Sequence, residues 1–114
     1  MPDCLFCRII AGEIPAAKLF EDEECVAIRD VNPMAPTHAL VLPREHIESA
    51  SALDERHEAL AGHLVRVGAR LARENGIAES GYRLVLNTNA DAGQTVFHLH
   101  LHLLGGRPME WPPG

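Results

Sequence analysis

Residues 96–104 read Val96-Phe97-His98-Leu99-His100-Leu101-His102-Leu103-Leu104, so that histidine alternates with large apolar residues. Successive side chains of a β-strand point to opposite faces, and this alternation therefore predicts a strand with two chemically different faces. Phe97, Leu99, Leu101 and Leu103 are expected to enter a core, and the three histidines are expected to line the other face. A solvated strand face usually carries Lys, Glu, Thr or Ser, so three histidines favour a chemical role for that face.

The spacing of the histidines limits how they can bind a metal ion. At a rise of about 3.3 Å per residue, neighbouring histidines lie roughly 6.7 Å apart and the outer two roughly 13 Å apart. A regular strand therefore cannot bring all three onto one ion. His98 and His100 could share a metal with a third ligand from elsewhere, or the three imidazoles could have three separate roles.

Length and composition indicate one globular domain over residues 1–114. Apolar residues make up 46% and charged residues 23%, which argues against disorder, and every long apolar run is interrupted, which argues against a membrane class. The N-terminus has no basic region followed by an apolar stretch, so we expect a cytoplasmic protein. Three cysteines do not describe a disulfide framework.

Charge constrains the ligands. The net charge is −6 and no basic stripe is present, so a nucleic acid polymer is not an expected partner. Lys18 is the only lysine, so a bound phosphate would have to be held mainly by imidazoles, backbone amides and hydroxyls.

The chain favours an α+β fold. Its patterns predict a short helix over 4–11, a hairpin of strands near 19–20 and 25–28, and strands over 38–42 and 82–87. One long helix is expected over 54–75, with Ser51 or Asp54 as N-cap and Gly76 as the stop. The expected architecture is an antiparallel, meandering sheet of about five strands with the long helix packed on it and a short N-terminal helix.

The long helix carries two adjacent stripes. The first is apolar, and its members are Leu53, His57, Leu60, Leu64, Val67 and Leu71; the second has small residues, Ala61, Val65, Gly68 and Ala72. A face this wide is explained either by a dimer contact or by a single deeply packed helix.

The histidine strand has the groups for attack on phosphorus. A neutral imidazole is nucleophilic near pH 7, and if Nε2 of His100 attacks, Nδ1 must donate its proton to an acceptor that fixes the ring. A backbone carbonyl or a second histidine, such as His38, could be that acceptor. Gly93, Gln94 and Thr95 precede the strand and offer backbone N–H groups, an amide and a hydroxyl to phosphate oxygens, and His102 could add another donor.

The sequence resembles the histidine triad superfamily and its branch of histidine triad nucleotide-binding proteins. Residues 98–104 match the signature His-x-His-x-His-x-x with apolar x. Matching stretches follow in the same order over nearly the whole chain: 13–15 (Glu-Ile-Pro), 35–38 (Ala-Pro-Thr-His), 93–97, 105–107 and 111–114 (Trp-Pro-Pro-Gly).

The resemblance implies a homodimeric purine nucleoside phosphoramidase, which hydrolyses the P–N bond of adenosine or guanosine 5′-phosphoramidates to a nucleoside monophosphate and an amine. It implies that His100 is the nucleophile, that His38 orients it, and that His102 and Thr95 contact the phosphate or protonate the amine. The resemblance implies that Asp30 and Asn87 bind the ribose hydroxyls and the nearby sugar or phosphate. It implies an apolar base pocket formed by Phe6, Ile9, Ile14, Ile28 and Leu40. Gly93, Gln94 and Val96 complete the expected nucleotide-binding set. Trp111, in the tail over 105–114, is implied to reach the partner subunit's site.

Cys4 and Cys7 at C-x-x-C spacing are half of a tetrahedral zinc site or two cysteines buried for packing. Similar bacterial proteins imply a structural zinc on this pair together with His46 and His98, and no catalytic metal. Two other functions stay open: a nucleotide-binding regulatory or scaffold protein with little hydrolysis, and a hydrolase of dinucleoside polyphosphates.

Overall fold

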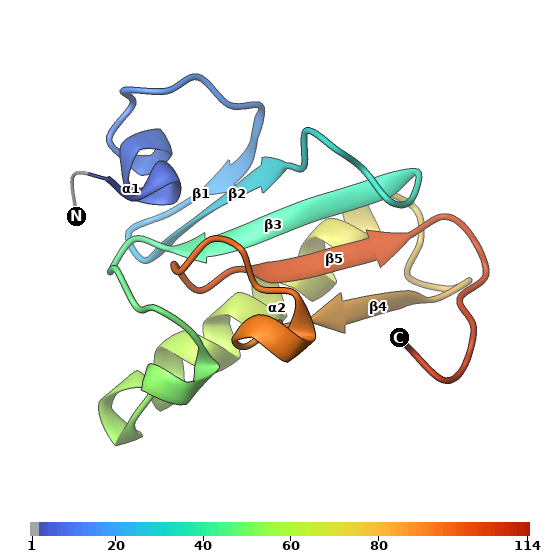
Figure 1. The fold of residues 1–114 in the computed structure, drawn as a ribbon. Coiled ribbons are helices and arrows are strands. Elements are labelled where there is room, and N and C mark those ends of the chain that lie inside the picture. The colour runs from blue at the N-terminus through green and yellow to red at the C-terminus, as the bar shows by residue number, and fades with distance from the viewer. Residues whose placement is uncertain (1–2) are drawn as a thin grey trace.

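In the computed structural model, which describes residues 3–114, five strands form one antiparallel sheet in the order β1-β2-β3-β5-β4 (Figure 1). The strands are β1 (Lys18–Glu21), β2 (Cys25–Arg29), β3 (Thr37–Pro43), β4 (Tyr82–Val85) and β5 (Leu101–Gly105). The helices are α1 (Leu5–Ile10) and α2 (Glu58–Glu74), with short 3-10 turns at Ala50–Ala52, Glu55–His57 and Ala90–Ala92. The α+β prediction is confirmed. β5 lies between β3 and β4, so the last two strands enter the sheet in reverse order.

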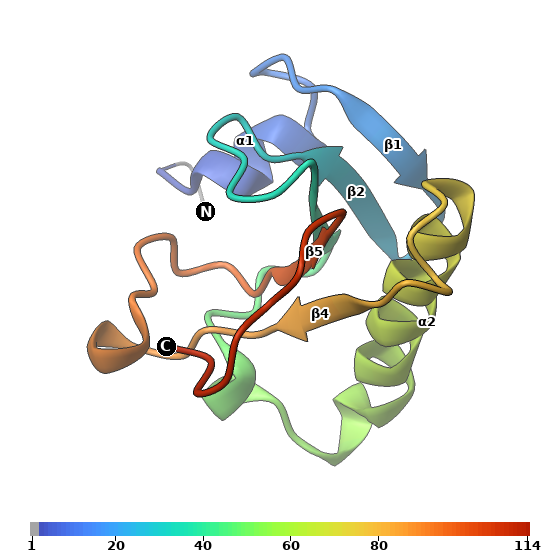
Figure 2. The same cartoon turned by 90° about the vertical axis from the view of Figure 1, so that its right-hand side faces the viewer.

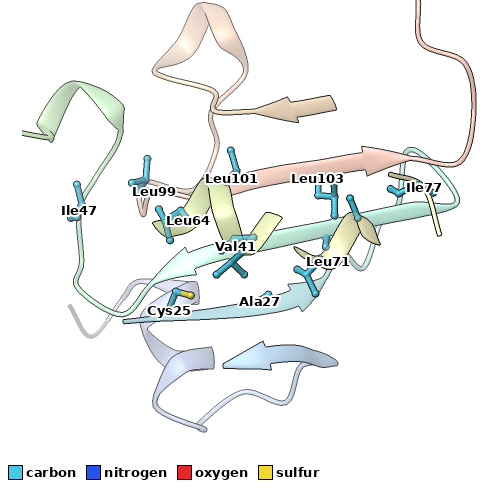
Figure 3. Packing of buried hydrophobic residues seen from close by; sticks show 13 residues of the cluster. Cys25, Ala27, Val41, Ile47, Leu64, Leu71, Ile77, Leu99, Leu101 and Leu103 are labelled. Atoms are coloured by element: carbon cyan, nitrogen blue, oxygen red, sulfur yellow. The ribbon is translucent and has the colours of Figure 1, made fainter. Parts of the chain in front are cut away.

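The sheet has two faces that differ in function. Figure 2 shows α2 against one face, while α1 and the long connections lie on the other. Alternate residues of the central strands face α2 and form the larger core, in which Figure 3 shows Ala27, Val41, Leu101 and Leu103 with Leu64 and Leu71 of α2. The residues between them face α1. The α1 face carries a second, smaller apolar core that includes Phe6, Val26 and Leu42, and His38 and His102 lie on this same face.

The predicted strand over 96–104 is wrong in its first half. Regular pairing begins only at Leu101, and Phe97, which the alternation placed in the core, is 47% exposed. The backbone before Leu101 is held by loops instead, because the Leu99 N–H donates to Ile47 O at 2.6 Å. The alternation does hold for Leu99, Leu101 and Leu103, which are all buried.

The long helix begins within a turn of the predicted position. The Asp54 carboxylate accepts the Arg56 N–H at 3.0 Å and the Asp54 N–H donates to Nδ1 of His57 at 3.0 Å. This capping box belongs to the 3-10 turn Glu55–His57 that leads into α2, whose own N-cap, His57, makes no side-chain cap bond. Ser51, the other candidate cap, lies in the preceding 3-10 turn, which Ser49 caps. Gly76 ends the helix with φ +72°. Neither α2 nor any other helix within residues 3–114 is long and apolar enough to cross a bilayer.

The stripe of small residues on α2 contacts the molecule's own sheet over part of its length. Gly68 and Ala72 are buried, and a Cβ on Gly68 would lie 3.1 Å from Cδ2 of Leu84 and 3.4 Å from Cδ2 of Leu101. Val65 in the same stripe is 45% exposed. The close approach that this stripe permits is therefore made inside one subunit at Gly68, while Val65 is left at the surface.

Candidate functional site

Two histidines on the α1 side of the sheet form a hydrogen-bonded pair. β3 and β5 pair so that Leu40 lies opposite His102 and His38 lies opposite Leu104, which places the two histidines diagonally on one face. Nε2 of His38 is 2.9 Å from Nδ1 of His102, and the Met34 N–H donates to Nδ1 of His38 at 3.0 Å. Because Nδ1 of His38 is an acceptor, the proton of neutral His38 is on Nε2 and is donated to His102. Neutral His102 then carries its own proton on Nε2.

The electrostatics keep this pair neutral at pH 7. Burial lowers the pKa of His38, and the negative charge of Asp30, whose Oδ2 is 3.3 Å from Nε2, opposes that shift. Burial, together with the nearby His100 and His38, lowers the pKa of His102 to about 4, and the negative charge of Asp30 opposes part of this shift. His102 is therefore a neutral donor with a fixed tautomer.

His100 is held with one ring nitrogen free. Its Nδ1 lies 2.7 Å from the carbonyl oxygen of His98, and because a carbonyl can only accept, Nδ1 carries the proton. Nε2 is left with an available lone pair. The acceptor that fixes His100 is thus the backbone carbonyl, one of the two alternatives raised by the sequence, whereas His38 contacts His102 instead. The ring of His100 lies 4.9 Å from that of His102 and 5.0 Å from that of Phe6, centroid to centroid.

His98 is fully buried rather than on an open face. Its Nε2 lies 2.8 Å from the carbonyl of Pro43, which fixes the proton on Nε2 and leaves the Nδ1 lone pair pointing away from the sheet. Around that nitrogen lie Sγ of Cys4 at 3.4 Å, Sγ of Cys7 at 3.5 Å and Nδ1 of His46 at 3.2 Å. The four ligand atoms that the resemblance implied for zinc are all within 4.8 Å of one another.

The separations within this cluster fit a tetrahedral zinc ion. Zinc bonds of about 2.0–2.3 Å put neighbouring ligand atoms roughly 3.3–3.8 Å apart. The shortest contacts among the sulfur and nitrogen atoms are 3.2–3.5 Å. Desolvation and the neighbouring Cys4 raise the pKa of the Cys7 thiol, so the chain alone disfavours a thiolate there and a cation would favour it. The chemistry of the donor set therefore also fits a metal ion.

Local structure explains how the two sulfurs meet. Cys4 is the N-cap of α1, and its Sγ accepts the Cys7 N–H at 3.3 Å. Residues three apart lie on one side of a helix, so both sulfurs face His98 from the same end of α1. His46 comes from the connection after β3, and His98 precedes β5.

Gly93, Gln94 and Thr95 lie in the connection between β4 and β5, and Thr95 lines a pocket together with Cys4 and His46. Gly93 adopts φ +82°, a left-handed conformation that favours glycine, and its N–H donates to Ala90 O at 2.9 Å. Gln94 is buried, and its amide is hydrogen-bonded to backbone groups. Thr95 is exposed, so its hydroxyl is open to a ligand.

The five residues expected around a base, and the nucleotide-binding candidate Val96, belong to one apolar cluster between α1 and the sheet. Phe6, Ile9, Ile28 and Leu40 are buried members, and Ile14 and Val96 pack against them. Asn87 is half-buried just beyond β4, and Trp111 is 82% exposed in the tail.

The sequence raised a backbone carbonyl as the acceptor for His100 without indicating which one, and it did not anticipate the backbone groups that bind His38 and His98. The Met34 N–H and the carbonyls of Pro43 and His98 set the tautomers of His38, His98 and His100 respectively. Every residue has such groups, so residue type gave no signal for them. Two further histidines lie outside the site: His63 contacts Asp22 at 2.7 Å and His57 contacts Glu45 at 3.2 Å.

Comparison with known proteins gives consistent matches over nearly the whole chain. A family model described as the HIT domain matches residues 11–109. The purine nucleoside phosphoramidase of Escherichia coli K12 is 44% identical over 107 residues, which are 94% of this chain and 90% of that protein. The crystal structure of a HIT family hydrolase from Legionella pneumophila superposes with a TM-score of 0.96 at 48% identity and covers 98% of this chain and 100% of its own.

A structure described as zinc-bound is also similar. This histidine triad family protein from Mycobacterium smegmatis has a TM-score of 0.80 and 33% identity, over 93% of this chain and 76% of its own.

Proposed function

Because the chain belongs to the HIT domain family, we propose that it is a purine nucleoside phosphoramidase, which hydrolyses the P–N bond of adenosine or guanosine 5′-phosphoramidates. The observation that carries the proposal is His100, whose Nδ1 proton is donated to His98 O at 2.7 Å, so that Nε2 is free to attack. The similarity to the E. coli enzyme of that name supports the choice of substrate.

In the first step, Nε2 of His100 attacks phosphorus, a P–N bond to the histidine forms, and the P–N bond to the amine breaks. The departing nitrogen takes a proton from solvent and leaves as the amine, and the phosphorylated ring of His100 becomes positively charged. The Nε2–H of neutral His102, whose Nδ1 accepts the His38 proton across 2.9 Å, donates a hydrogen bond to the phosphate or to the departing nitrogen and stays neutral.

In the second step, water attacks phosphorus and the bond to His100 breaks. The proton of the water returns to solvent, so each histidine recovers its neutral starting state. The products are a nucleoside monophosphate and an amine. The fixed tautomers of the His102 and His38 pair keep the His102 Nε2–H as a hydrogen-bond donor in both steps.

The remaining site residues are assigned to binding. Phe6, Ile9, Ile14, Ile28, Leu40 and Val96 are proposed to hold the purine, and their membership of one apolar cluster supports this. Asp30 and Asn87 are proposed to contact the sugar. The Thr95 hydroxyl is proposed to donate to phosphate oxygens, with Gly93 and Gln94 beside the phosphate.

We assign a structural zinc ion to Cys4, Cys7, His46 and His98, on the strength of their separations. Bound zinc would cross-link α1 to the segments around His46 and His98, and no step of the reaction uses it. We place the protein in the cytoplasm, where a reducing environment keeps Cys4 and Cys7 available as ligands. We also propose a homodimer in which the tail with Trp111 reaches the partner subunit's site.

The deciding experiment measures hydrolysis of an adenosine 5′-phosphoramidate bearing a fluorescent amine. The wild type should turn over, while His100→Ala and His100→Gly should lose several orders of magnitude in kcat and still bind AMP. His63→Ala is the matched control, since His63 lies on α2 against Asp22, and it should retain turnover.

The other outcomes decide between the alternatives. A wild type that binds AMP without turnover would leave a nucleotide-binding regulatory protein. Faster cleavage of a dinucleoside polyphosphate than of the phosphoramidate would indicate a P–O–P hydrolase.

A further inference from the structure

We propose that Gln94 is a positioning residue that holds the connection over 89–96 in a strained form and thereby presents Thr95 to the phosphate. The inference rests on the proposed phosphoramidase function. It assigns Gln94 an action through the backbone rather than a contact with the substrate.

The amide of Gln94 is fully used by the backbone. The side chain is 6% exposed. Oε1 accepts the Asn89 N–H at 2.8 Å, and Nε2 donates to Glu48 O at 2.8 Å and to Val96 O at 3.1 Å. Both hydrogens of the amide group therefore have acceptors already, and none is left for a phosphate oxygen.

The residue that Gln94 holds is strained. Asn89 has φ +67° and ψ −172°, a region that residues other than glycine rarely adopt. Gln94 binds both backbone groups of Asn89, because its own N–H also donates to Asn89 O at 3.1 Å. Such a conformation persists only where the surroundings enforce it, and strain of this kind gathers at functional sites.

The hydrogen bonds of Gln94 determine which group of residues 93–95 can donate to a phosphate. The backbone N–H groups of Gly93 and Gln94 donate to the carbonyl oxygens of Ala90 and Asn89, respectively. Thr95 is exposed, so it is the donor of residues 93–95 that a ligand can reach. The bond from Nε2 to Glu48 O ties Thr95 to the segment that carries His46, two residues earlier in the chain. Thr95 is thus held in place because its neighbour Gln94 is bonded both to its own connection and to Glu48.

The test uses two substitutions of Gln94 and one control. Gln94→Ala removes all three side-chain bonds, whereas Gln94→Glu keeps an acceptor for Asn89 and loses both donors. Asn75→Ala is the control, because its amide donates to one backbone carbonyl, Leu71 O, at the end of α2. Each variant is compared with the wild type for kcat, KM and adenosine affinity on the fluorescent phosphoramidate.

Both Gln94 variants should lose about 10- to 100-fold in kcat, since a misplaced donor costs roughly that much, with adenosine affinity within about threefold of wild type. Asn75→Ala should keep its kcat even if it melts earlier. A Gln94→Glu variant with wild-type kcat would overturn the proposal, because the tethers to Glu48 and Val96 would then be dispensable.

A double-mutant cycle with Thr95→Val separates positioning from direct contact. If Gln94 acts through Thr95, Gln94→Glu should cost less than about twofold in the Thr95→Val background. Losses that multiply would show that Gln94 contacts the substrate or acts by another path, and would overturn the proposal.

Hydrogen exchange gives a readout that does not depend on catalysis. The Asn89 amide should be protected in the wild type and in Gln94→Glu, and should exchange faster in Gln94→Ala. Equal protection of the Asn89 amide in all three proteins would contradict the proposed role of Gln94. If the wild type fails to hydrolyse the substrate, the proposed function falls, but this comparison still decides whether Gln94 holds the loop.

Discussion

His102 shows at the scale of one residue how the fold selects a protonation state. Its ring is half-buried between His38 and His100, and these surroundings make the charged form unfavourable. An imidazole in water would be partly charged near its ordinary pKa. Here the neutral form and one tautomer are fixed before any substrate arrives.

The depressed pKa makes stability depend on pH. The pKa of His102 is about 4 in the folded protein, against 6.5 ordinarily, so between these values the unfolded chain binds more protons. The contribution is complete above pH 6.5 and is lost as the pH falls through 4. In denaturant titrations, wild type should therefore lose on the order of 2 kcal/mol more stability than His102→Gln between these limits. Equal losses in the two proteins would refute the assignment.

At the scale of secondary-structure elements, the Cys4, Cys7, His46 and His98 cluster joins α1 to the segments that follow β3 and precede β5. α1 has only six residues, too few to be stable alone. It is fixed by its apolar contact with the sheet and, when zinc is bound, by its two sulfurs.

The zinc content should depend on the four proposed ligands and not on the total number of cysteines. Protein purified without a histidine tag should contain about one zinc per chain, and Cys4→Ser and Cys7→Ser should lose it, because zinc sites of this type need four ligands. Cys25→Ala is the control and should keep its zinc, since Cys25 is a fully buried core residue under α2. Chelation of wild type should lower its melting temperature. Absence of zinc together with an unchanged melting temperature in Cys4→Ser would contradict the site.

The contact of α2 with the sheet predicts opposite effects at two glycines of the same helix. Gly68→Val should destabilise the protein by about 1–3 kcal/mol, because its Cβ already meets Leu84 at 3.1 Å and Leu101 at 3.4 Å. Gly62→Ala should stabilise by about 0.5–1 kcal/mol, because its Cβ meets nothing within 4 Å and alanine favours helix. Thermal and urea unfolding of both variants checks the pair. A stable Gly68→Val would show that the sheet can move away from α2.

At the scale of the whole molecule, the exposed apolar residues bear on assembly. Val65 on α2 is 45% exposed, and Leu86 beyond the edge strand β4 is 40% exposed. In sedimentation at micromolar concentration the wild type should be a dimer, and Val65→Glu should shift it towards monomer by placing a charge in the contact. Val31→Glu is the matched control, because Val31 is 89% exposed in the connection before β3. A wild type that sediments as a monomer would contradict the proposed dimer.

The sequence predicted the elements better than it predicted the contacts between them. The periodicity of α2 and the alternation of Leu99, Leu101 and Leu103 are local, and both are confirmed because each buries a repeating face. Phe97 broke the alternation because the backbone there bonds to the segment around Ile47 instead of to a strand. Nothing in the local pattern encodes that long-range bond.

The site shows the same limit. Residue types pointed to His38, His100 and His102, but their tautomers depend on backbone groups that only the folded chain brings near. The zinc set came from resemblance, since spacing alone gave only Cys4 and Cys7. For Gln94 the residue type suggested a phosphate contact, while its partner Glu48 O lies 46 positions away in the chain.

The alternation between the two faces of β5 also limits how this gene can change. Leu101 and Leu103 lie under α2, and His102 between them belongs to the other face. One inserted or deleted codon here would exchange the two sets, burying an imidazole in the core and turning leucines towards His38. The effect of a substitution within this strand on the fold therefore depends on the residue that is changed. In contrast, a change of the strand's length by a single residue disrupts both faces at once. Among descendants of this chain, lengths should drift in the surface loops and stay constant across these few positions.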